Sequence, residues 1–383
     1  MQWNSNTTFK LSLVTLSLAT TSVFANNYAV DGRGNGMGGT GVVTASYLTA
    51  PFYNPALGTI YRQNDDVGMI LPGVGIGYVN QDGLMDDIEN LMDVMDQPIV
   101  DPDEVNSALN ALSGDQVRTE IGAIAAFAIP NPIVSTNVFT KIYNDTYATP
   151  LVPDGSDPID RAESSAVHAV SVGIFEFGVN FAKYANVLGH HMSFGIAPKF
   201  QQIYTYVDSS SLESFEILEM GGEMTSESGL NLDAGALWFY GPLRLGIAGK
   251  NLLSKSVDTA SYTETIGSET YNVGYRYDLT PVYTVGAGYV DDYMSFSVDY
   301  DINSDKRFNA FDDDVKMLRV GAEFDLARQA QIRVGYKTNR LSDEEVYTAG
   351  LGISPFGLFH LDAAINYKSM DNLGLYANFL VYY

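Results

Sequence analysis

The sequence contains no cysteine and only four histidines among its 383 residues. Without thiols the chain forms no disulfide, binds no metal through thiolates and uses no cysteine nucleophile. His190 and His191 fall in an expected turn with no acidic residue at metal-ligand spacing, and no G-x-S-x-G motif occurs. We expect neither an enzyme nor a bound metal or cofactor, although a Ser–His–acid site built from distant residues stays open.

Basic residues are scarce as well, since 21 Lys and Arg stand against 46 Asp and Glu for a formal net charge of −25. A nucleic-acid partner needs a basic surface for its phosphates, so we expect none. Many acids gather in segments expected to be loops, namely Asp82, Asp86, Asp87, Glu89, Asp93, Asp96, Asp101, Asp103 and Asp312–Asp314. Such clusters of acidic residues are typical of solvent-exposed loops. Calcium binding stays open, although no run has the EF-hand spacing.

Long apolar runs are absent after the first 25 residues. This first segment carries a single charge, Lys10, followed by a short apolar centre and by Val23-Phe24-Ala25, which resembles a cleavage site. The centre is too short to cross about 30 Å of hydrocarbon. We therefore expect a signal peptide that is cleaved near Ala25. Because only helices and closed barrels satisfy the backbone in lipid, the exported chain is either soluble or a β-barrel.

Alternating polarity in the last hundred residues favours the barrel. From Tyr283 to Tyr383, segments of roughly ten residues alternate between apolar and polar side chains. Successive side chains of a strand point to opposite faces, so each segment has one apolar face. We expect this face to meet lipid at Val298, Val320, Val334 and Ile365. A soluble β-sandwich also alternates, but the many aromatic residues near strand ends and at the C-terminus favour a transmembrane barrel.

The same pattern over the whole chain predicts an all-β fold, a transmembrane antiparallel β-barrel of about 14 strands. The expected strands are 66–80, 120–129, 133–147, 167–184, 192–208, 225–239, 243–256, 274–289, 293–303, 315–326, 330–337, 345–354, 359–368 and 374–383. Helical spacing predicts short extracellular helices near 84–95 and 105–112, with another at 212–220. Short turns alternate with long loops, as they do between the periplasmic and external sides of such barrels.

Residues 31–42 read D-G-R-G-N-G-M-G-G-T-G-V, and residues 50–57 read A-P-F-Y-N-P-A-L. The glycines do not form a dinucleotide fingerprint, because no hydrophobic strand precedes them. They allow positive φ and close backbone approach, which a plug inside a barrel needs. This pair of motifs resembles the N-terminal signature of the FadL-type outer-membrane proteins. The run Leu243–Leu252 and the aromatic C-terminus extend the resemblance, and the whole chain looks most like the TraF-like family that is named for conjugal transfer.

The resemblance implies an N-terminal glycine-rich hatch in the lumen, with a signal peptide at 1–25, the hatch at 26–65 and the barrel at 66–383. The expected hatch residues are Arg33, Gly34, Gly36, Met37, Gly38, Gly39, Asn54, Pro55 and Ala56. By alternation, the expected polar residues of the lumen are Lys199, Asp233, Arg244, Asp299, Arg319, Glu323, Arg333, Lys337 and Asp362. They could hold the hatch by ion pairs or select a solute. Pro72 and Pro198, with Pro198 preferred, are candidate strand kinks for a lateral exit, because proline cannot donate to the ladder.

Hydrophobic small molecules cross the characterised FadL-type barrels, so the resemblance implies passage of hydrophobic or amphipathic small molecules. The alternative is a structural or accessory outer-membrane protein linked to conjugal transfer or to a secretion apparatus, without transport. The expected location is the outer membrane of a Gram-negative bacterium. The expected partners are its lipid and lipopolysaccharide, the barrel assembly machinery, which would bind the C-terminal strand, and a hydrophobic small molecule.

Overall fold

The computed structural model describes residues 30–61, 66–81, 83–215, 223–309, 311, 313–326, 329–342, 344–355, 359–369 and 372–382. The expected signal peptide and Tyr383 lie outside these residues. So do the first residues of the hatch range, residues 62–65, most of the expected helix at 212–220, and parts of the turns near 328 and 357.

Fourteen antiparallel strands form a closed barrel, which confirms the predicted fold class. The barrel strands are β1 Gly68–Gln81, β2 Gln116–Ile129, β3 Ser135–Leu151, β4 Ala166–Val187, β5 His190–Ser211, β6 Glu223–Tyr240, β7 Leu243–Lys250, β12 Val282–Val290, β13 Met294–Asp301, β14 Met317–Leu326, β15 Ala330–Asn339, β16 Glu345–Ile353, β17 Phe359–Ser369 and β18 Asn372–Tyr382. Each pairs with the next barrel strand along the chain, and β1 pairs with β18 to close the ring.

Alternation decides which face of each strand points outward. In β16 every second residue is exposed and the residues between them are buried. The outward residues are apolar on neighbouring strands, as at Leu351, Val334 and Leu361. A soluble monomer rarely exposes so wide an apolar surface. The strand pattern therefore produces an apolar belt around the barrel of the kind that contacts hydrocarbon in transmembrane barrels.

The prediction was wrong between β7 and β12, where it extended both strands too far. β7 ends at Lys250, and Asn251 then adopts a left-handed conformation with φ of 52°. The following residues form two small antiparallel sheets, β8 Lys255–Asp258 with β11 Arg276–Leu279, and β9 Tyr262–Ile266 with β10 Glu269–Val273. The polar pair Lys250-Asn251 and the apolar pair Leu252-Leu253 interrupt the alternation at this point, and the prediction continued the strand through both pairs.

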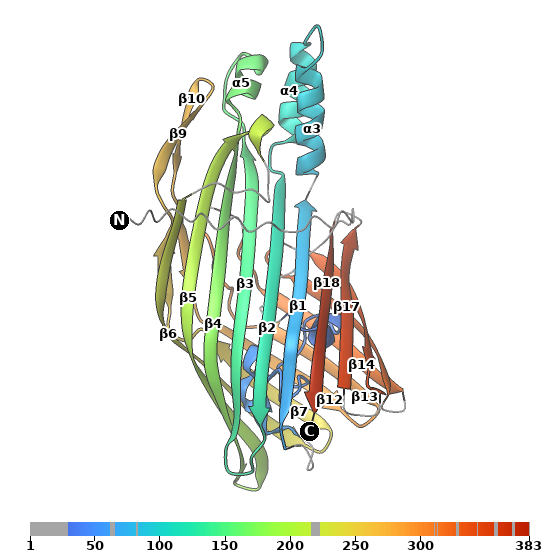
Figure 1. Cartoon of the computed structure of the whole chain (residues 1–383). Helices are drawn as coiled ribbons and strands as arrows, with labels where there is room; N and C mark the ends of the chain where they lie inside the picture. Colours follow the sequence, from blue (N-terminus) through green and yellow to red (C-terminus); the bar gives the residue numbers. More distant parts are fainter. Residues whose placement is uncertain are drawn as a thin grey trace, which may run out of the picture.

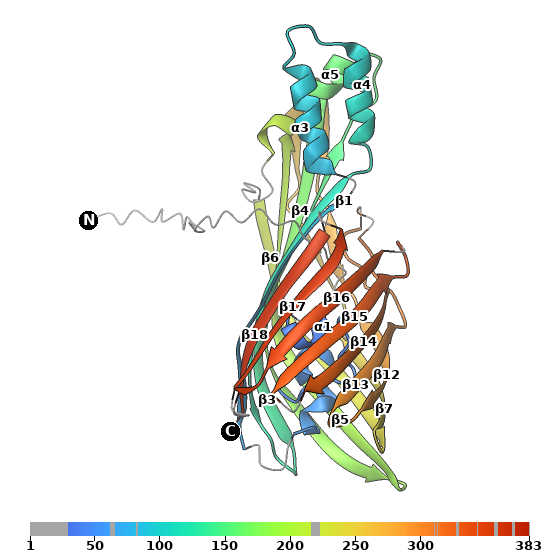
Figure 2. The same ribbon diagram turned by 90° about the vertical axis from the view of Figure 1, so that its right-hand side faces the viewer.

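Helices gather at one end of the barrel, called here the helical end; the opposite end, with the short hairpin turns, is called the short-turn end (Figures 1 and 2). The helices α3 Leu84–Met95 and α4 Pro102–Ala111 pack together through buried apolar residues. A third helix, α5 Pro158–Ser164, was not predicted; the Asp157 side chain caps its N-terminus. At the expected helix 212–220, only the 3₁₀ turn η2 Leu212–Ser214 is described. No helix among the described residues is long and apolar enough to cross a membrane.

Candidate functional site: the hatch and the barrel lumen

The N-terminal segment runs inside the barrel and contains α1 Gly32–Gly36, α2 Ala50–Tyr53 and the 3₁₀ helix η1 Pro55–Thr59 (Figure 2). We call residues 30–61 the hatch. α1 packs against β15 to β18, and η1 packs against β3 to β6, so the hatch contacts both sides of the wall. Its apolar side chains, including Val43, Leu48 and Leu57, are fully buried in the largest apolar cluster of the lumen. The tertiary structure thus places all nine hatch candidates within the lumen.

Glycines on both chains bring the hatch backbone against the wall. Gly38 has a φ of 70°, and its N–H donates to Thr348 Oγ1 at 2.8 Å. A Cβ on the wall residue Gly335 would lie 2.2 Å from the Gly38 nitrogen, and a Cβ on Gly321 would lie 2.2 Å from the Met37 carbonyl oxygen. No real Cβ contact is that short. The inward positions of β14 and β15 therefore have no room for a side chain at this level, because hatch backbone fills the space.

The Gly335→Ala variant is therefore expected to displace the hatch, because the added methyl group overlaps its backbone. Overpacking of this kind costs about 1–3 kcal/mol. We expect faster proteolysis within residues 30–61 and a lower unfolding midpoint for the purified barrel. The matched control is Gly173→Ala, whose Cβ would have no neighbour closer than 3.7 Å. Equal proteolysis of the two variants would contradict the close contact at Gly335.

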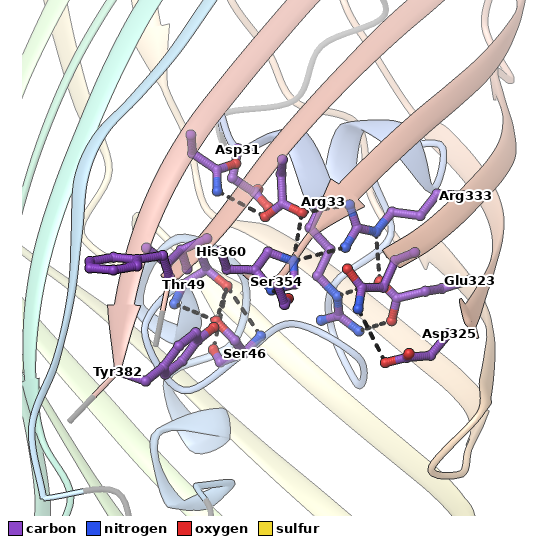
Figure 3. A pocket seen from close by; sticks show the side chains of 15 residues that line it. Asp31, Arg33, Ser46, Thr49, Glu323, Asp325, Arg333, Ser354, His360 and Tyr382 are labelled. Atoms are coloured by element: carbon purple, nitrogen blue, oxygen red, sulfur yellow. Dashed lines mark hydrogen bonds and ion pairs between the residues drawn. The ribbon is translucent and has the colours of Figure 1, made fainter. Parts of the chain in front are cut away.

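Ion pairs join the hatch to β14, β15 and β17 (Figure 3). Arg33 binds both oxygens of Glu323, with Nε at 2.9 Å and Nη2 at 2.7 Å. Arg333, whose side chain is fully buried, donates to Glu323 at 2.6 Å and to Asp362 at 2.6 Å. Burial by itself lowers the pKa of Arg33, but the neighbouring Glu323 carboxylate outweighs this effect and raises the pKa above its ordinary value. One carboxylate therefore holds two guanidiniums, the half-buried one of Arg33 from the hatch and the buried one of Arg333 from the wall.

Carboxylates also organise the hatch itself. Asp31 accepts hydrogen bonds from the Gly34 N–H at 2.9 Å and from the Tyr53 hydroxyl, so it joins α1 to α2. Burial raises the pKa of Asp31 above its ordinary value. On the wall, Asp299 accepts from two consecutive N–H groups of the hatch, those of Gly41 at 2.7 Å and Val42 at 2.9 Å.

The Asn54-Pro55-Ala56 motif forms a turn that is held against β5 and β6. Asn54 Oδ1 accepts from the Ala56 N–H at 3.0 Å, and its Nδ2 donates to the Val42 carbonyl at 3.0 Å. Ser193 on β5 donates to the Ala56 carbonyl at 2.7 Å. A Cβ on Gly195 would lie 2.2 Å from the carbonyl carbon of Pro55. The turn is thus fixed from within the hatch and from the wall.

The remaining polar candidates divide into two groups. Arg244 donates to the Val43 carbonyl of the hatch at 3.1 Å. Lys199 instead bonds two wall carboxylates, Glu176 at 3.1 Å and Asp233 at 2.9 Å. Arg319 pairs with Asp301 at 2.9 Å, and Lys337 is fully buried. Arg244, Asp299, Glu323, Arg333 and Asp362 therefore belong to the hatch contacts or to the ion network at Arg33, whereas Lys199, Asp233 and Arg319 pair with other wall residues. Lys337 is placed in neither group.

A second ion network lies toward the helical end, and the sequence analysis did not single it out. Arg307, in the loop between β13 and β14, reaches Asp145 on β3, which stands nearly opposite in the ring. Asp145 also binds Arg118 at 2.8 Å. Nearby, Phe308 packs edge-on against Tyr277 of β11, and burial raises the pKa of Asp313 to about 7. Alternation along β2 could have placed the Arg118 side chain in the lumen. No local sequence pattern, however, indicates which residue pairs with Arg307 in the loop.

The two prolines differ in their effect on the sheet. At Pro72 the register of β1 shifts against both neighbours, β18 and β2, between Ile70 and Gly73. At Pro198 the register with β4 is the same on both sides of the proline, and pairing with β6 continues through it. The geometry favours Pro72, so the preference for Pro198 is not supported.

A cavity of about 380 Å³ lies between the hatch and strands β14 to β18, near the short-turn end (Figure 3). It is lined by the side chains of the Arg33 ion network and by Asp31, Ser46, Thr49, Asp325, Gln331, Ser354, Phe359, His360, Asn378, Leu380 and Tyr382. Two smaller cavities, of about 50 and 110 Å³, lie nearer the helical end and also contain charged side chains. Among the described residues, no group of three or more His, Asp and Glu side chains has the arrangement of a metal site.

Comparisons with known proteins agree with this architecture. Residues 51–301 match the model of the family described as F plasmid transfer operon, TraF, protein. The toluene transporter TbuX of Ralstonia pickettii superposes with a TM-score of 0.60 at 11% identity, covering 94% of this chain and 99% of that one. A TodX mutant described as a monoaromatic hydrocarbon channel gives 0.56 at 11% identity, covering 92% and 98%.

The toluene transporter TodX of Pseudomonas putida gives a TM-score of 0.52 at 10% identity, covering 95% of this chain and 99% of that one. No curated protein sequence matches the chain. At these identities the structural likeness concerns the fold alone, and it agrees with the predicted transmembrane β-barrel.

Proposed function

The chain belongs to the family described as F plasmid transfer operon, TraF, protein, and on that premise we propose that it lets hydrophobic or amphipathic small molecules pass through the outer membrane of a Gram-negative bacterium. The observation that carries the proposal is a closed barrel whose lumen holds the hatch beside a cavity of ligand size. The barrels of similar fold include toluene transporters and a monoaromatic hydrocarbon channel. Solutes of this class are therefore the first to test.

The outward apolar belt supports placement in a membrane, with lipid and lipopolysaccharide as its surroundings. The short-turn end would face the periplasm and the helical end the exterior, because turns are short on the periplasmic side of outer-membrane barrels. The expected signal peptide would direct export, with cleavage near Ala25. The barrel assembly machinery would engage β18, the C-terminal strand.

Two barriers would then obstruct the passage of a solute through the lumen. The hatch fills the lumen toward the short-turn end, where Arg33 and Glu323 hold it. The loop that carries Arg307 crosses the lumen nearer the helical end, where Asp145 holds it. The Arg33–Glu323 pair is half-buried and the Arg307–Asp145 pair is buried, so opening either barrier needs a replacement partner for the separated charges. We propose that the hatch is the gate and that the Arg307 loop restricts the external mouth.

A lateral exit, if the solute leaves into lipid, would lie at the seam between β1 and β18. The bulge at Leu71 and Pro72 puts two consecutive residues on the exposed face of β1. The ladder pairs that flank it are Ile70 with Leu380 and Gly73 with Asn378. Leu380 and Asn378 also line the cavity beside the hatch, so the irregular part of this ladder adjoins that cavity.

Deletion of Gly34–Leu57 tests the gate. We expect cells that make the folded, hatch-deleted barrel to take up toluene or an apolar antibiotic several-fold faster than cells with the intact barrel. The reason is that the deletion removes the backbone that fills the lumen. Uptake is measured at equal surface amounts of the two proteins, and folding is checked by the difference in gel migration with and without boiling. Unchanged uptake through a folded, hatch-deleted barrel would reject the gate.

A structural or accessory role is the second candidate. The ion pairs that fill the lumen favour it, because a rigid wall and a fixed hatch need no solute. This role predicts that the hatch deletion weakens folding and leaves uptake unchanged. The same experiment therefore separates the two functions.

A further inference from the structure

Carboxylates outnumber guanidiniums in the lining of the cavity beside the hatch. Four carboxylates line it, Asp31, Glu323, Asp325 and Asp362, against two guanidiniums and the imidazole of His360, which bonds Asp362 at 2.9 Å. Both guanidiniums already bind carboxylates: Arg33 binds Glu323, and Arg333 binds Glu323 and Asp362. An anionic ligand would have to displace one of these buried carboxylates, which is costly. The charge of the cavity therefore favours a cationic ligand over an anionic one.

A buried acceptor on the cavity wall independently points to a donor on the ligand. Gln331 is 5% exposed and lines the cavity. Its Nε2 donates to Asp325 at 3.3 Å, which fixes the orientation of the amide. Its Oε1 has no hydrogen-bond partner among the described residues. Most buried polar atoms have a partner, and one that lacks it is costly. A ligand N–H group beside Oε1 and Asp325 would satisfy this acceptor.

Apolar surface lies on the other side of the same cavity. Leu380 and Tyr382 of β18 line it, and Figure 3 shows Tyr382 and Asp325 on opposite sides of the close-up. The Tyr382 ring packs against Tyr47 of the hatch, with ring centroids 6.0 Å apart. A volume of about 380 Å³ lies within the range of small-molecule sites. The cavity thus combines a cation-accepting side with an aromatic and aliphatic side.

We propose that this cavity binds a small amphipathic amine, whose protonated ammonium group bonds Gln331 Oε1 and Asp325 and whose aromatic or aliphatic body contacts Leu380 and Tyr382. This proposal rests on the proposed passage function, and it specifies the class of solute. The bidentate Arg33–Glu323 pair lies in the same cavity. Occupation of the site would consequently bring a positive charge near the contact that holds the hatch.

Three isosteric probes test the charge preference: phenethylamine, 2-phenylethanol and phenylacetate. Binding to the full-length purified barrel is measured by isothermal titration calorimetry at neutral pH, where the amine is protonated. We expect phenethylamine to bind at least about tenfold more tightly than 2-phenylethanol, because a hydrogen bond to a charged group is the stronger one. Phenylacetate should bind most weakly. Equal affinities, tighter binding of phenylacetate, or no binding of phenethylamine would each overturn the proposal.

Variants then locate the site. Gln331→Met keeps the size of the side chain and removes the acceptor, so it should weaken phenethylamine binding about tenfold. Gln331→Lys should reverse the preference in favour of phenylacetate. The matched control is Gln202→Met on the outward side of β5, which should leave the affinity unchanged. Only variants that keep the heat-dependent gel migration are compared. Unchanged binding in both folded Gln331 variants would overturn the assignment.

Failure of this proposal and failure of the proposed function have different outcomes. Faster hydrocarbon uptake through the hatch-deleted barrel, without amine preference in the binding assay, keeps the passage function and overturns the amine site. Selective amine binding that depends on Gln331, with unchanged uptake, supports the amine site and rejects the passage function.

Discussion

Replacing Glu323 by glutamine is expected to destabilise the barrel by about 3–5 kcal/mol and to release the hatch. Glu323 accepts from Arg33 on the hatch and from Arg333 on β15. The neutral amide cannot balance two positive charges. Arg333 keeps the carboxylate of Asp362, but the hydrogen-bond partners described for Arg33 then include no carboxylate, only the new amide oxygen and the carbonyl of Thr44. Because Arg33 is partly accessible to solvent, the lower end of the range is expected.

The measurement combines unfolding by denaturant with limited proteolysis of residues 30–61. Glu269→Gln is the matched control, since Glu269 is exposed on β10 and its loss should change the free energy of unfolding by no more than about 0.5 kcal/mol. A double-mutant cycle with Arg33→Met isolates the pair. Arg33→Met should cost less in the Glu323→Gln background than in the native protein. Additive costs would show that the two side chains do not stabilise each other.

Replacing Val334 by arginine is expected to cost about 2–4 kcal/mol in a lipid bilayer. Val334 is 50% exposed on the outward face of β15, and its ladder partners Ala322 and Ala349 also face outward. A guanidinium there would enter the middle of the apolar belt, where it has no partner and little water. Unfolding in vesicles of defined lipid measures the cost.

The control for Val334→Arg is Ser228→Arg, at an exposed outward position of β6. Ser228 pairs with Gln202, at a level where polar residues replace the apolar belt. Arginine at this level should cost about 0–1 kcal/mol, as it does near the membrane interface. If both variants lost the same stability, the belt would not lie in hydrocarbon and the barrel would not have the proposed membrane position.

The hatch shows how far local sequence patterns reach. Glycine spacing and the Asn54-Pro55 turn predict a compact segment that approaches other backbone closely. The pattern does not indicate which barrel residues opposite the hatch must also be glycine. Gly335 and Gly321 read as ordinary strand glycines, and their role follows only from their contacts with Gly38 and Met37. Those contacts join residues roughly three hundred positions apart, so no local signal encodes them.

Alternation of polar and apolar residues is encoded locally, in successive residues of one strand. It predicts the number of strands and the face of the sheet to which each strand side chain points. The strand prediction failed at Asn251, because it was continued past Lys250-Asn251 and Leu252-Leu253, where the alternation is interrupted and the chain leaves the wall. Partner choice is different, because it depends on ring closure, register and the path of loops. Closure of the ring around one lumen brings Glu323 to Arg33 and Asp145 to Arg307. It also leaves Gln331 Oε1 without a hydrogen-bond partner in the part of the chain that the structure describes. Local periodicity therefore specifies the barrel, whereas closure of the barrel creates the gate and the cavity.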